Sequence, residues 1–143
     1  MKKFSIIALL LIVVFAVLGL LLADNQSDNI LSNEGINISI MEPIPDSVVD
    51  SPLEIRGEAR GPWYFEANFS VYIEDANGVR LGGHYATAQG DWMTEEFVPF
   101  SAELSFSEPT TDTGVLVLEK ANPSGLPEHA DELRIPVRFS VNE

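Results

Sequence analysis

The stretch FEANFSVYIEDANG, residues 65–78, decides the fold class of this chain. Phe65, Ala67, Phe69, Val71 and Ile73 fall on one face, and Glu66, Asn68, Ser70, Tyr72 and Glu74 fall on the other. A strict period of two predicts a β-strand with one buried face. The stretch closes on Asn77-Gly78, a pair that tolerates the positive φ of a tight hairpin turn. We therefore predict that VRLGGHYATA, residues 79–88, is the return strand.

The same alternation recurs on both sides of this hairpin. Its apolar sets are Ile36, Ile38 and Ile40; Leu53, Ile55, Gly57 and Ala59; Phe100, Ala102, Leu104 and Phe106; and Ile135, Val137, Phe139 and Val141. The run GVLVLEKA, residues 114–121, is typical of a strand buried on both sides. About seven short strands, with no helical periodicity after residue 23, predict an all-β fold: an immunoglobulin-like antiparallel β-sandwich. Pro136 cannot donate a ladder hydrogen bond, which favours an edge strand or an outward-facing N–H position.

The N-terminus carries a candidate membrane segment. Residues 4–23, FSIIALLLIVVFAVLGLLLA, contain no charge and follow Lys2 and Lys3. A helix of this length crosses a hydrocarbon layer of about 30 Å, with the lysines on the cytoplasmic side. The alternative is a cleaved signal peptide, but the apolar run is longer than usual for one. Cleavage after Ala23 would also put the bulky Leu21 where a small side chain is needed.

These features divide the chain into three parts. We predict a signal-anchor or signal peptide at residues 1–23, which forms one N-terminal hydrophobic helix. A polar spacer follows at residues 24–35, and the β-sandwich domain occupies residues 36–143. The predicted location is the cell membrane, single-pass, with the domain extracytoplasmic. If the N-terminal segment is cleaved, the domain is secreted.

Charge and cysteine content narrow the partners. The part after Ala23 contains six Arg or Lys against 22 Asp or Glu, a net charge of −16. Such an acidic surface disfavours nucleic acid and anionic lipid headgroups as partners. The absence of cysteine means that an exported domain has no disulfides and is held by packing alone.

Several runs together resemble a known family. They are SPLEIRGEA, FEANFSVYIEDANG, GDWMTEEFVPFSAELSF, the turn NPSG and a terminal IPVRF. In these runs the chain resembles the bacterial spore-germination immunoglobulin-like domain over roughly residues 36–141. The residues that carry the resemblance are Ser51, Pro52, Leu53, Gly57, Ala59, Phe65, Glu66, Asp75, Gly78, Trp92, Phe97, Phe100, Leu104, Phe106, Gly114, Ser124, Gly125, Ile135, Pro136 and Val137. It implies an extracytoplasmic β-sandwich, often attached to envelope proteins of spore formers, without established catalysis.

The segment GDWMTEEFVPFSAELSF, residues 90–106, sets carboxylates beside aromatic rings. Asp91, Glu95 and Glu96, with His84, are conceivable metal ligands or acid–base groups, but their spacing matches neither a calcium loop nor a zinc site. With two histidines and no cysteine in the chain, we predict no metal and no cofactor. We interpret Trp92, Met93, Phe97 and Phe100 as apolar residues that close one end of the sandwich.

A second cluster, RGPWYFE at residues 60–66, precedes the longest strand. We predict a partner-binding surface formed by Trp63, Tyr64 and Glu66 together with Tyr72, which lies on the outward parity of that strand. The competing interpretation folds Trp63 back over the hydrophobic rim and pairs Glu66 with Arg56 or Arg60.

The sequence favours binding over catalysis. Ser101, Ser105, Ser107 and Ser124 lack a Gly-x-Ser-x-Gly context, so we predict no enzyme activity. The predicted function is a non-enzymatic extracytoplasmic binding or adaptor module of the bacterial envelope, which the resemblance links to spore germination. Its partner would be an envelope protein or the cell wall. The alternative is a carbohydrate- or cation-dependent wall-binding domain that uses Trp63, Tyr64 or Trp92.

Overall fold

The computed structural model describes residue 35 and residues 37–140. The predicted membrane segment, nearly all of the predicted spacer, Ile36 and Val141 lie outside the described residues. Within the described part, no helix has the length and apolarity needed to cross a membrane.

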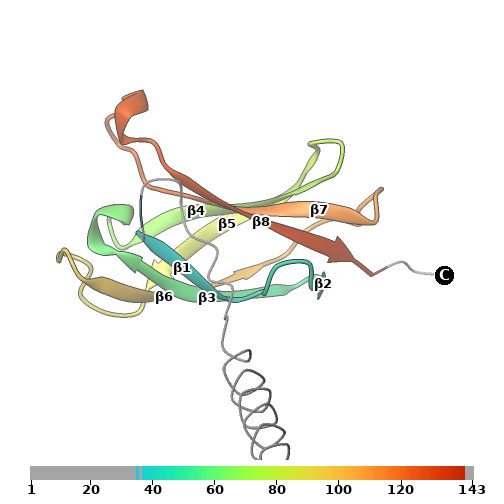
Figure 1. Ribbon diagram of the computed structural model, residues 1–143, viewed down its shortest axis with the longest axis horizontal. Helices are drawn as coiled ribbons and strands as arrows, with labels where there is room; N and C mark the ends of the chain where they lie inside the picture. The colour runs from blue at the N-terminus through green and yellow to red at the C-terminus, as the bar shows by residue number, and fades with distance from the viewer. Residues whose placement is uncertain (1–34, 36, 141–143) are drawn as a thin grey trace, which may run out of the picture.

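Eight strands and two short 3₁₀ turns make up the described part. They are β1 (Ile38–Glu42), β2 (Val48–Val49), β3 (Leu53–Arg60), η1 (Gly61–Trp63), β4 (Asn68–Asp75), β5 (Arg80–Ala88), β6 (Phe97–Leu104), β7 (Thr113–Glu119), η2 (Pro127–His129) and β8 (Glu132–Phe139). The strands are hydrogen-bonded in the order β1-β3-β6-β5-β4-β7-β8-β2. The sheet curls so that β1, β3 and β6 lie opposite β4, β7 and β8 (Figure 1). The predicted all-β, two-layered fold is confirmed.

The sheet departs from the predicted antiparallel arrangement at one strand. After β1 the chain meets Pro43 and Pro45, leaves the β3 layer and crosses to the other one. There Val48 and Val49 pair in parallel with Arg138 and Phe139 of β8. The sheet is therefore mixed, with eight strands instead of about seven. A strand of two residues is too short to show alternation, so this pairing had no sequence signal.

Strand β5 links the two layers. It pairs with β4 along most of its length but with β6 only at Thr87↔Ser101 and Ala88↔Phe100. The predicted turn joins β4 to β5: Gly78 has a φ of 76°, and the main chains of Asp75 and Val79 are hydrogen-bonded.

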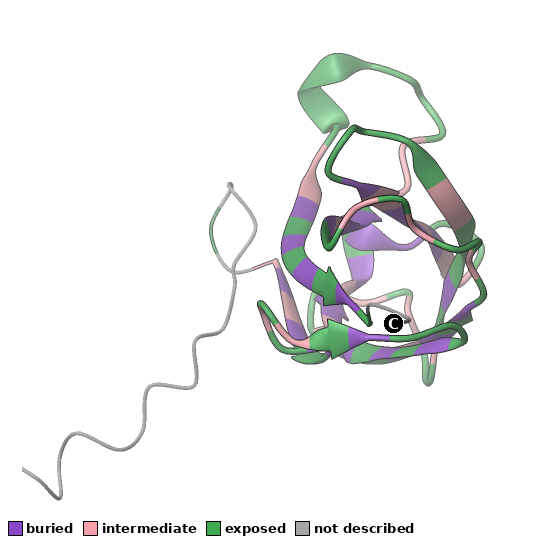
Figure 2. Ribbon diagram, turned by 90° about the vertical axis from the view of Figure 1, so that its right-hand side faces the viewer, coloured by how far each residue is buried: buried purple, intermediate pink, exposed green. Residues whose placement is uncertain are grey.

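Alternating residues of both layers fill the interior. Figure 2 shows buried and exposed residues alternating along the strands around a common interior. Phe69, Val71 and Ile73 of β4 are buried as predicted, and the centre of β7 is buried on both faces. The largest fully buried side chains are Trp63, Phe69, Phe100, Ile38, Ile55, Ile73, Leu104, Leu116, Leu118, Leu133, Ile135 and Val71.

Pro136 occupies a position where no ladder hydrogen bond is lost. Its carbonyl accepts a hydrogen bond from the Asp46 N–H at 2.8 Å, on the side of β8 that faces away from β7. Because N and C=O of one residue point to the same side of an antiparallel strand, the proline nitrogen also faces away from β7. The predicted outward N–H position is confirmed, on a strand that only the two-residue β2 separates from the sheet edge.

Candidate functional site

Three connections gather at one end of the sandwich, which we call the loop end: residues 61–67, 89–96 and 120–131. Figure 1 shows all three on the left, with the β7–β8 connection projecting furthest. Main-chain hydrogen bonds join them. The Gly61 N–H donates to the Glu96 carbonyl at 3.1 Å, and the Ala121 N–H donates to the Trp63 carbonyl at 3.0 Å. The loop end is therefore a cross-bonded unit that can hold side chains in fixed positions.

Two of the four predicted site residues lie inside the core. Trp63 is 2% exposed and Tyr64 is 4% exposed, and both rings pack against Phe69, with centroids 5.8 and 5.3 Å away. The Tyr64 hydroxyl donates to the Val98 carbonyl at 2.7 Å, and burial raises the pKa of Tyr64. Neither ring can reach a partner, so their placement on a contact surface was wrong. The competing interpretation, in which Trp63 folds inward, is confirmed.

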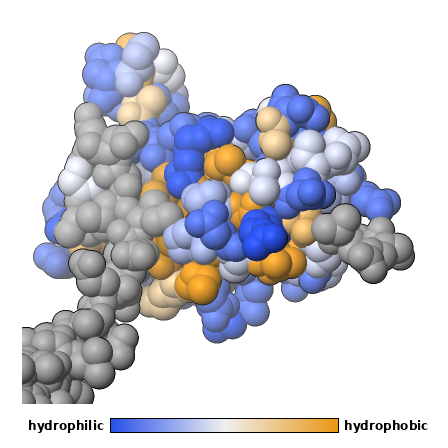
Figure 3. All heavy atoms as spheres, turned by 45° about the vertical axis from the view of Figure 1, so that its right-hand side comes forward, coloured by the Kyte–Doolittle hydropathy of each residue, from blue (hydrophilic) through white to orange (hydrophobic). Residues whose placement is uncertain are grey.

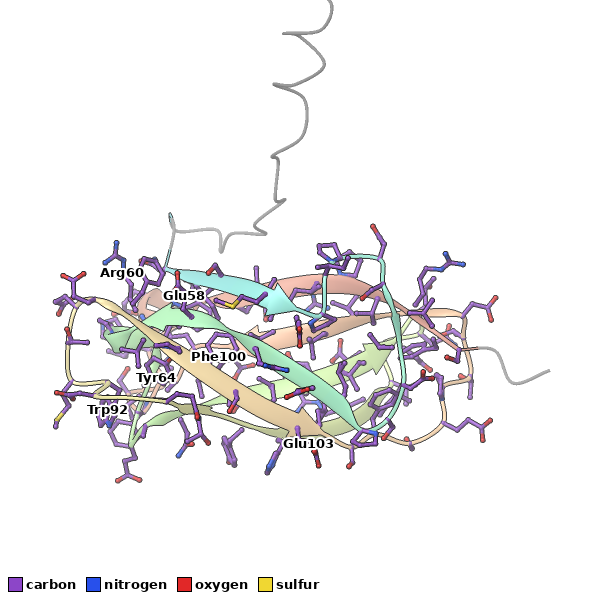
Figure 4. The ribbon with its side chains drawn as sticks, turned by 90° about the horizontal axis from the view of Figure 1, so that it is seen from below. Glu58, Arg60, Tyr64, Trp92, Phe100 and Glu103 are labelled. Atoms are coloured by element: carbon purple, nitrogen blue, oxygen red, sulfur yellow. The ribbon has the colours of Figure 1, made fainter. Side chains whose placement is uncertain are left out.

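The two arginines of β3, Arg60 and Arg56, have partners of their own. Figure 4 places Tyr64 and Trp92 at the same end of the sandwich and Arg60 pointing away from it. The Arg60 guanidinium stacks 4.5 Å from the centroid of the Phe97 ring and donates to the Glu95 carbonyl at 3.0 Å. Arg56 forms its ion pairs with Glu42 and Glu54.

Tyr72 lies apart from the loop end, on the outer face of the sheet. Tyr72 is 8% exposed, and the Arg80 guanidinium stacks 3.6 Å from the centroid of its ring. Burial, followed by the charges of Glu119 and its neighbouring glutamates, raises the pKa of Tyr72. Of the four predicted residues, only Glu66 is exposed at the loop end. The structure does not bring the four together on one surface.

Glu66 belongs to a turn that the sequence does not signal. The N–H of Phe65 donates to the Asn68 carbonyl at 2.9 Å, and the N–H of Asn68 donates to the Phe65 carbonyl at 3.1 Å. Glu66 and Ala67 form the turn between them, with φ of 51° and 65°. Glycine or asparagine usually occupies such positions, and a non-glycine residue there costs about 1–2 kcal/mol.

The turn reverses the predicted orientation of Phe65. Phe65 and Ala67 were expected to face the core with Phe69, but β4 begins only at Asn68, and Phe65 is 48% exposed. The prediction was wrong because the turn interrupts the alternation. Side-chain bonds hold the turn in place: Asn68 Nδ2 donates to the Glu66 carbonyl at 2.9 Å, and Thr87 Oγ1 donates to Asn68 Oδ1 at 2.9 Å.

A groove of about 400 Å³ runs beside this turn, and we call it the loop-end groove. Its lining consists of Phe65, Glu66, Asn68, Phe69, Ser70, Tyr85, Ala121, Asn122 and Pro123. The large hydrophobic side chains exposed in the described part are Met41, Ile44, Val48, Phe65, Val79, Tyr85, Met93 and Leu126. The two aromatic ones, Phe65 and Tyr85, both line this groove. On the face drawn in Figure 3, apolar atoms are interspersed with hydrophilic ones.

A larger cavity, of about 510 Å³, lies at the opposite end. Phe106 and Phe139, with ring centroids 5.9 Å apart, are its aromatic lining, and Phe139 is only 4% exposed. Two of its polar side chains are already engaged: Thr110 donates to Asp75, and Ser140 donates to Asp50. It offers a ligand less accessible aromatic surface than the loop-end groove, which we take as the candidate functional site.

The predicted apolar cap of residues 92–100 is partly confirmed. Phe100 is 2% exposed, and Trp92 is partly buried and packs against the core. Met93 is 77% exposed, so its assignment to the core was wrong. The Asp91 carboxylate accepts a hydrogen bond from the Met93 N–H at 3.0 Å, in a loop where the methionine side chain is exposed.

The acidic side chains of this loop do not converge with His84. Within residues 37–140, no three or more His, Asp or Glu side chains are grouped so as to hold a metal ion. Ser124 Oγ lies 3.1 Å from His129 Nδ1 and donates a hydrogen bond to Asn122 Oδ1 at 2.7 Å.

Comparison with known proteins places the domain in a family. The family model described as the immunoglobulin-like domain of bacterial spore germination matches residues 37–125, more than half of the chain. The match runs from β1 through β7 and into the connection before β8. No match was found among curated proteins or among solved structures. The resemblance is thus confirmed over residues 37–125, and the chain belongs to the family of immunoglobulin-like domains of bacterial spore germination.

Proposed function

We propose that this protein is a non-enzymatic binding module of the bacterial envelope, anchored by its N-terminal segment, that acts through its loop end in a process related to spore germination. The observation that carries the proposal is the loop-end groove, where two exposed aromatic side chains line one cross-bonded site. Exposed aromatic residues held on a rigid frame are characteristic of recognition surfaces.

Several features support binding over catalysis. The groove contains a carboxylate and hydroxyl groups but no histidine or cysteine, and Glu66 is the only carboxylate in its lining. General acid–base chemistry needs at least one further positioned group. Membership of a germination-associated family supports the envelope setting, in which the partner is either a membrane protein or the cell wall.

Position-specific crosslinking tests this proposal. In full-length protein expressed in a spore-forming bacterium, Leu126 at the loop end is replaced by the photoreactive residue p-benzoylphenylalanine. A matched variant carries it at Val79, on the β4–β5 turn at the opposite end. The two native side chains are 46% and 55% exposed, so accessibility is comparable.

We expect a discrete crosslinked species, to a protein or to wall material, from position 126 but not from position 79. Equal crosslinking at both positions would show contact without a preferred surface. No crosslink from position 126, in cells in which the protein is present at its normal level, would contradict binding through the loop end.

A further inference from the structure

We infer that the ligand of the loop-end groove is a neutral glycan, with sugar rings packed on Phe65 and Tyr85 and hydroxyl groups bonded to Glu66 and Ser70. This inference rests on the proposed binding function and specifies its ligand. Three observations support it: the exposed aromatic rings, the polar groups of the lining and the strand pairing that occupies both sides of β4.

The aromatic rings are presented at a conformational cost. Two consecutive non-glycine residues, Glu66 and Ala67, adopt positive φ, and the result is that Phe65 is turned out of the core. Core packing gains nothing from this arrangement, because the ring loses buried area. Strain that displays a side chain instead of burying it points to recognition as the reason for the turn.

The lining suits the chemistry of a sugar. The apolar C–H face of a pyranose packs against an aromatic ring, and its hydroxyl groups bond to carboxylate and hydroxyl oxygens. Ser70 and Tyr85 are directly paired in register, so their side chains leave the same face of the sheet. The lining contains no Lys or Arg, which disfavours an anionic ligand.

The groove is already shaped before a ligand binds. Asn68 bonds to Glu66 and Thr87, and Asn122 bonds to Ser124, Gly125 and Leu126. These amides therefore fix the two walls of the groove. A volume of about 400 Å³ is within the range of pockets that hold small ligands, about 300–1,000 Å³.

A peptide strand has no edge to join at this site. Ser70 of β4 is paired with Tyr85 of β5 on one side and with Glu119 of β7 on the other. Because both sides of β4 are occupied here, an added strand cannot form main-chain hydrogen bonds with it. Recognition in this groove depends on side chains, as in glycan binding.

Pelleting with purified cell-wall sacculi tests the inference. Full-length protein in mild detergent is incubated with sacculi, and the bound fraction is measured against protein concentration. Chitotetraose, peptide-free wall glycan strands, whose N-acetylglucosamine residues are as uncharged as those of chitotetraose, and wall stem peptides are added as separate competitors. The variants are Phe65→Ala and Tyr85→Ala, and Met93→Ala, an exposed apolar side chain outside the groove, is the control. Unchanged thermal unfolding of each variant verifies its fold.

We expect saturable retention that both glycan competitors displace, weakened about tenfold in each groove variant and unchanged in Met93→Ala. Retention that the groove variants leave intact would overturn the inference while leaving a binding function. Retention displaced by wall stem peptides but not by glycan strands would replace the glycan with a peptide ligand. If no protein is retained but the loop-end crosslinks to a protein are preserved, the inference that the ligand is a glycan is also overturned. Loss of both retention and crosslinks would remove the proposed function too.

Discussion

Phe69 of β4 and Phe100 of β6 meet edge to face across the interior, with ring centroids 5.0 Å apart and ring planes at 80°. This contact joins the two layers of the sandwich. Trp63 and Tyr64 pack on the other sides of Phe69, so that four aromatic rings support the loop end from beneath. The burial of these rings thus stabilises the base of the loop-end groove.

The two tryptophans should differ in their contribution to stability. Trp63 is 2% exposed, whereas Trp92 is only partly buried. Trp63→Ala should lower the free energy of unfolding by about 3–5 kcal/mol, and Trp92→Ala should lower it by less. Urea unfolding of both variants measures the difference. A larger loss for Trp92→Ala would mean that the core is centred on the β5–β6 loop instead.

Tyr64→Phe isolates one buried hydrogen bond. The substitution keeps the ring but removes the hydrogen bond that the hydroxyl donates to the Val98 carbonyl at 2.7 Å. We expect the free energy of unfolding to fall by about 0.5–1.5 kcal/mol, the net contribution of one such hydrogen bond. Tyr85→Phe provides the comparison, because it changes an exposed hydroxyl and should be nearly neutral. Equal effects would mean that the Tyr64 bond contributes nothing.

Much of the sandwich follows from local sequence. The alternation in β3, β4, β6 and β8 predicted which residues face the core, since the period of two is imposed by the strand itself. Asn77-Gly78 located the β4–β5 turn for the same local reason. For strands distant in sequence, only the fold class could be predicted. Which strands pair, and in which register, depends on both partners.

The candidate site was not predicted because its causes are not local. Trp63 precedes β4 in a 3₁₀ turn, and its burial depends on where the β7–β8 connection passes. Glu66 and Ala67 are not residue types that indicate positive φ, so the turn that exposes Phe65 could not be predicted. Tyr85 was assigned to the return strand, but nothing in its neighbours indicated a groove. The one available hint was Ser70, a polar residue of β4 that pairs with Tyr85 across the hairpin.

Gly57 allows β1 and β6 to approach β3 closely. A methyl group at this position would lie 2.2 Å from the Ser39 carbonyl oxygen and 2.7 Å from the Phe100 ring. Gly57→Ala should therefore lower the free energy of unfolding by about 1–3 kcal/mol. Gly83→Ala in β5 is the matched control, because its methyl group would meet only ordinary contacts at 3.6 Å. Thermal unfolding of both should show a loss for Gly57→Ala only; equal melting temperatures would contradict the packing.

Asp75 should give the protein a pH-dependent component of stability. N–H donation from Val79, together with the Thr110 hydroxyl and the Asn77 N–H, holds the pKa of Asp75 below its usual value of 3.8. A carboxylate with a lowered folded-state pKa stabilises the fold above its unfolded pKa, and this stabilisation is lost as the pH falls through the folded value.

The Asp75→Asn variant isolates that component. The substituted amide side chain is neutral at every pH but keeps an oxygen that accepts the same N–H bonds. The melting temperature of the native protein should exceed that of the variant at pH 6, and the difference should shrink as the pH is lowered from about 5 to 2. A difference that stays constant over this range would show that Asp75 does not titrate at a lowered pKa.

Ala67→Gly should stabilise the protein, although it removes a side chain. Glycine adopts a φ of 65° without the clash that an alanine side chain causes, a relief of about 1–2 kcal/mol. The greater freedom of glycine in the unfolded chain offsets part of this gain, about 0.4–1 kcal/mol. The net rise in the free energy of unfolding should be at most about 1.5 kcal/mol. In contrast, Ala86→Gly in β5, a fully buried position outside the positive-φ residues, should destabilise.

The two alanine variants have opposite expected signs, so urea unfolding distinguishes strain from a general effect of glycine. If Ala67→Gly destabilises the protein as much as Ala86→Gly does, the Glu66-Ala67 turn is not strained. If it stabilises, the native chain retains a residue that is worse for its fold than glycine. A residue kept against stability at the wall of the groove is expected where a rigid display of Phe65 is needed for binding.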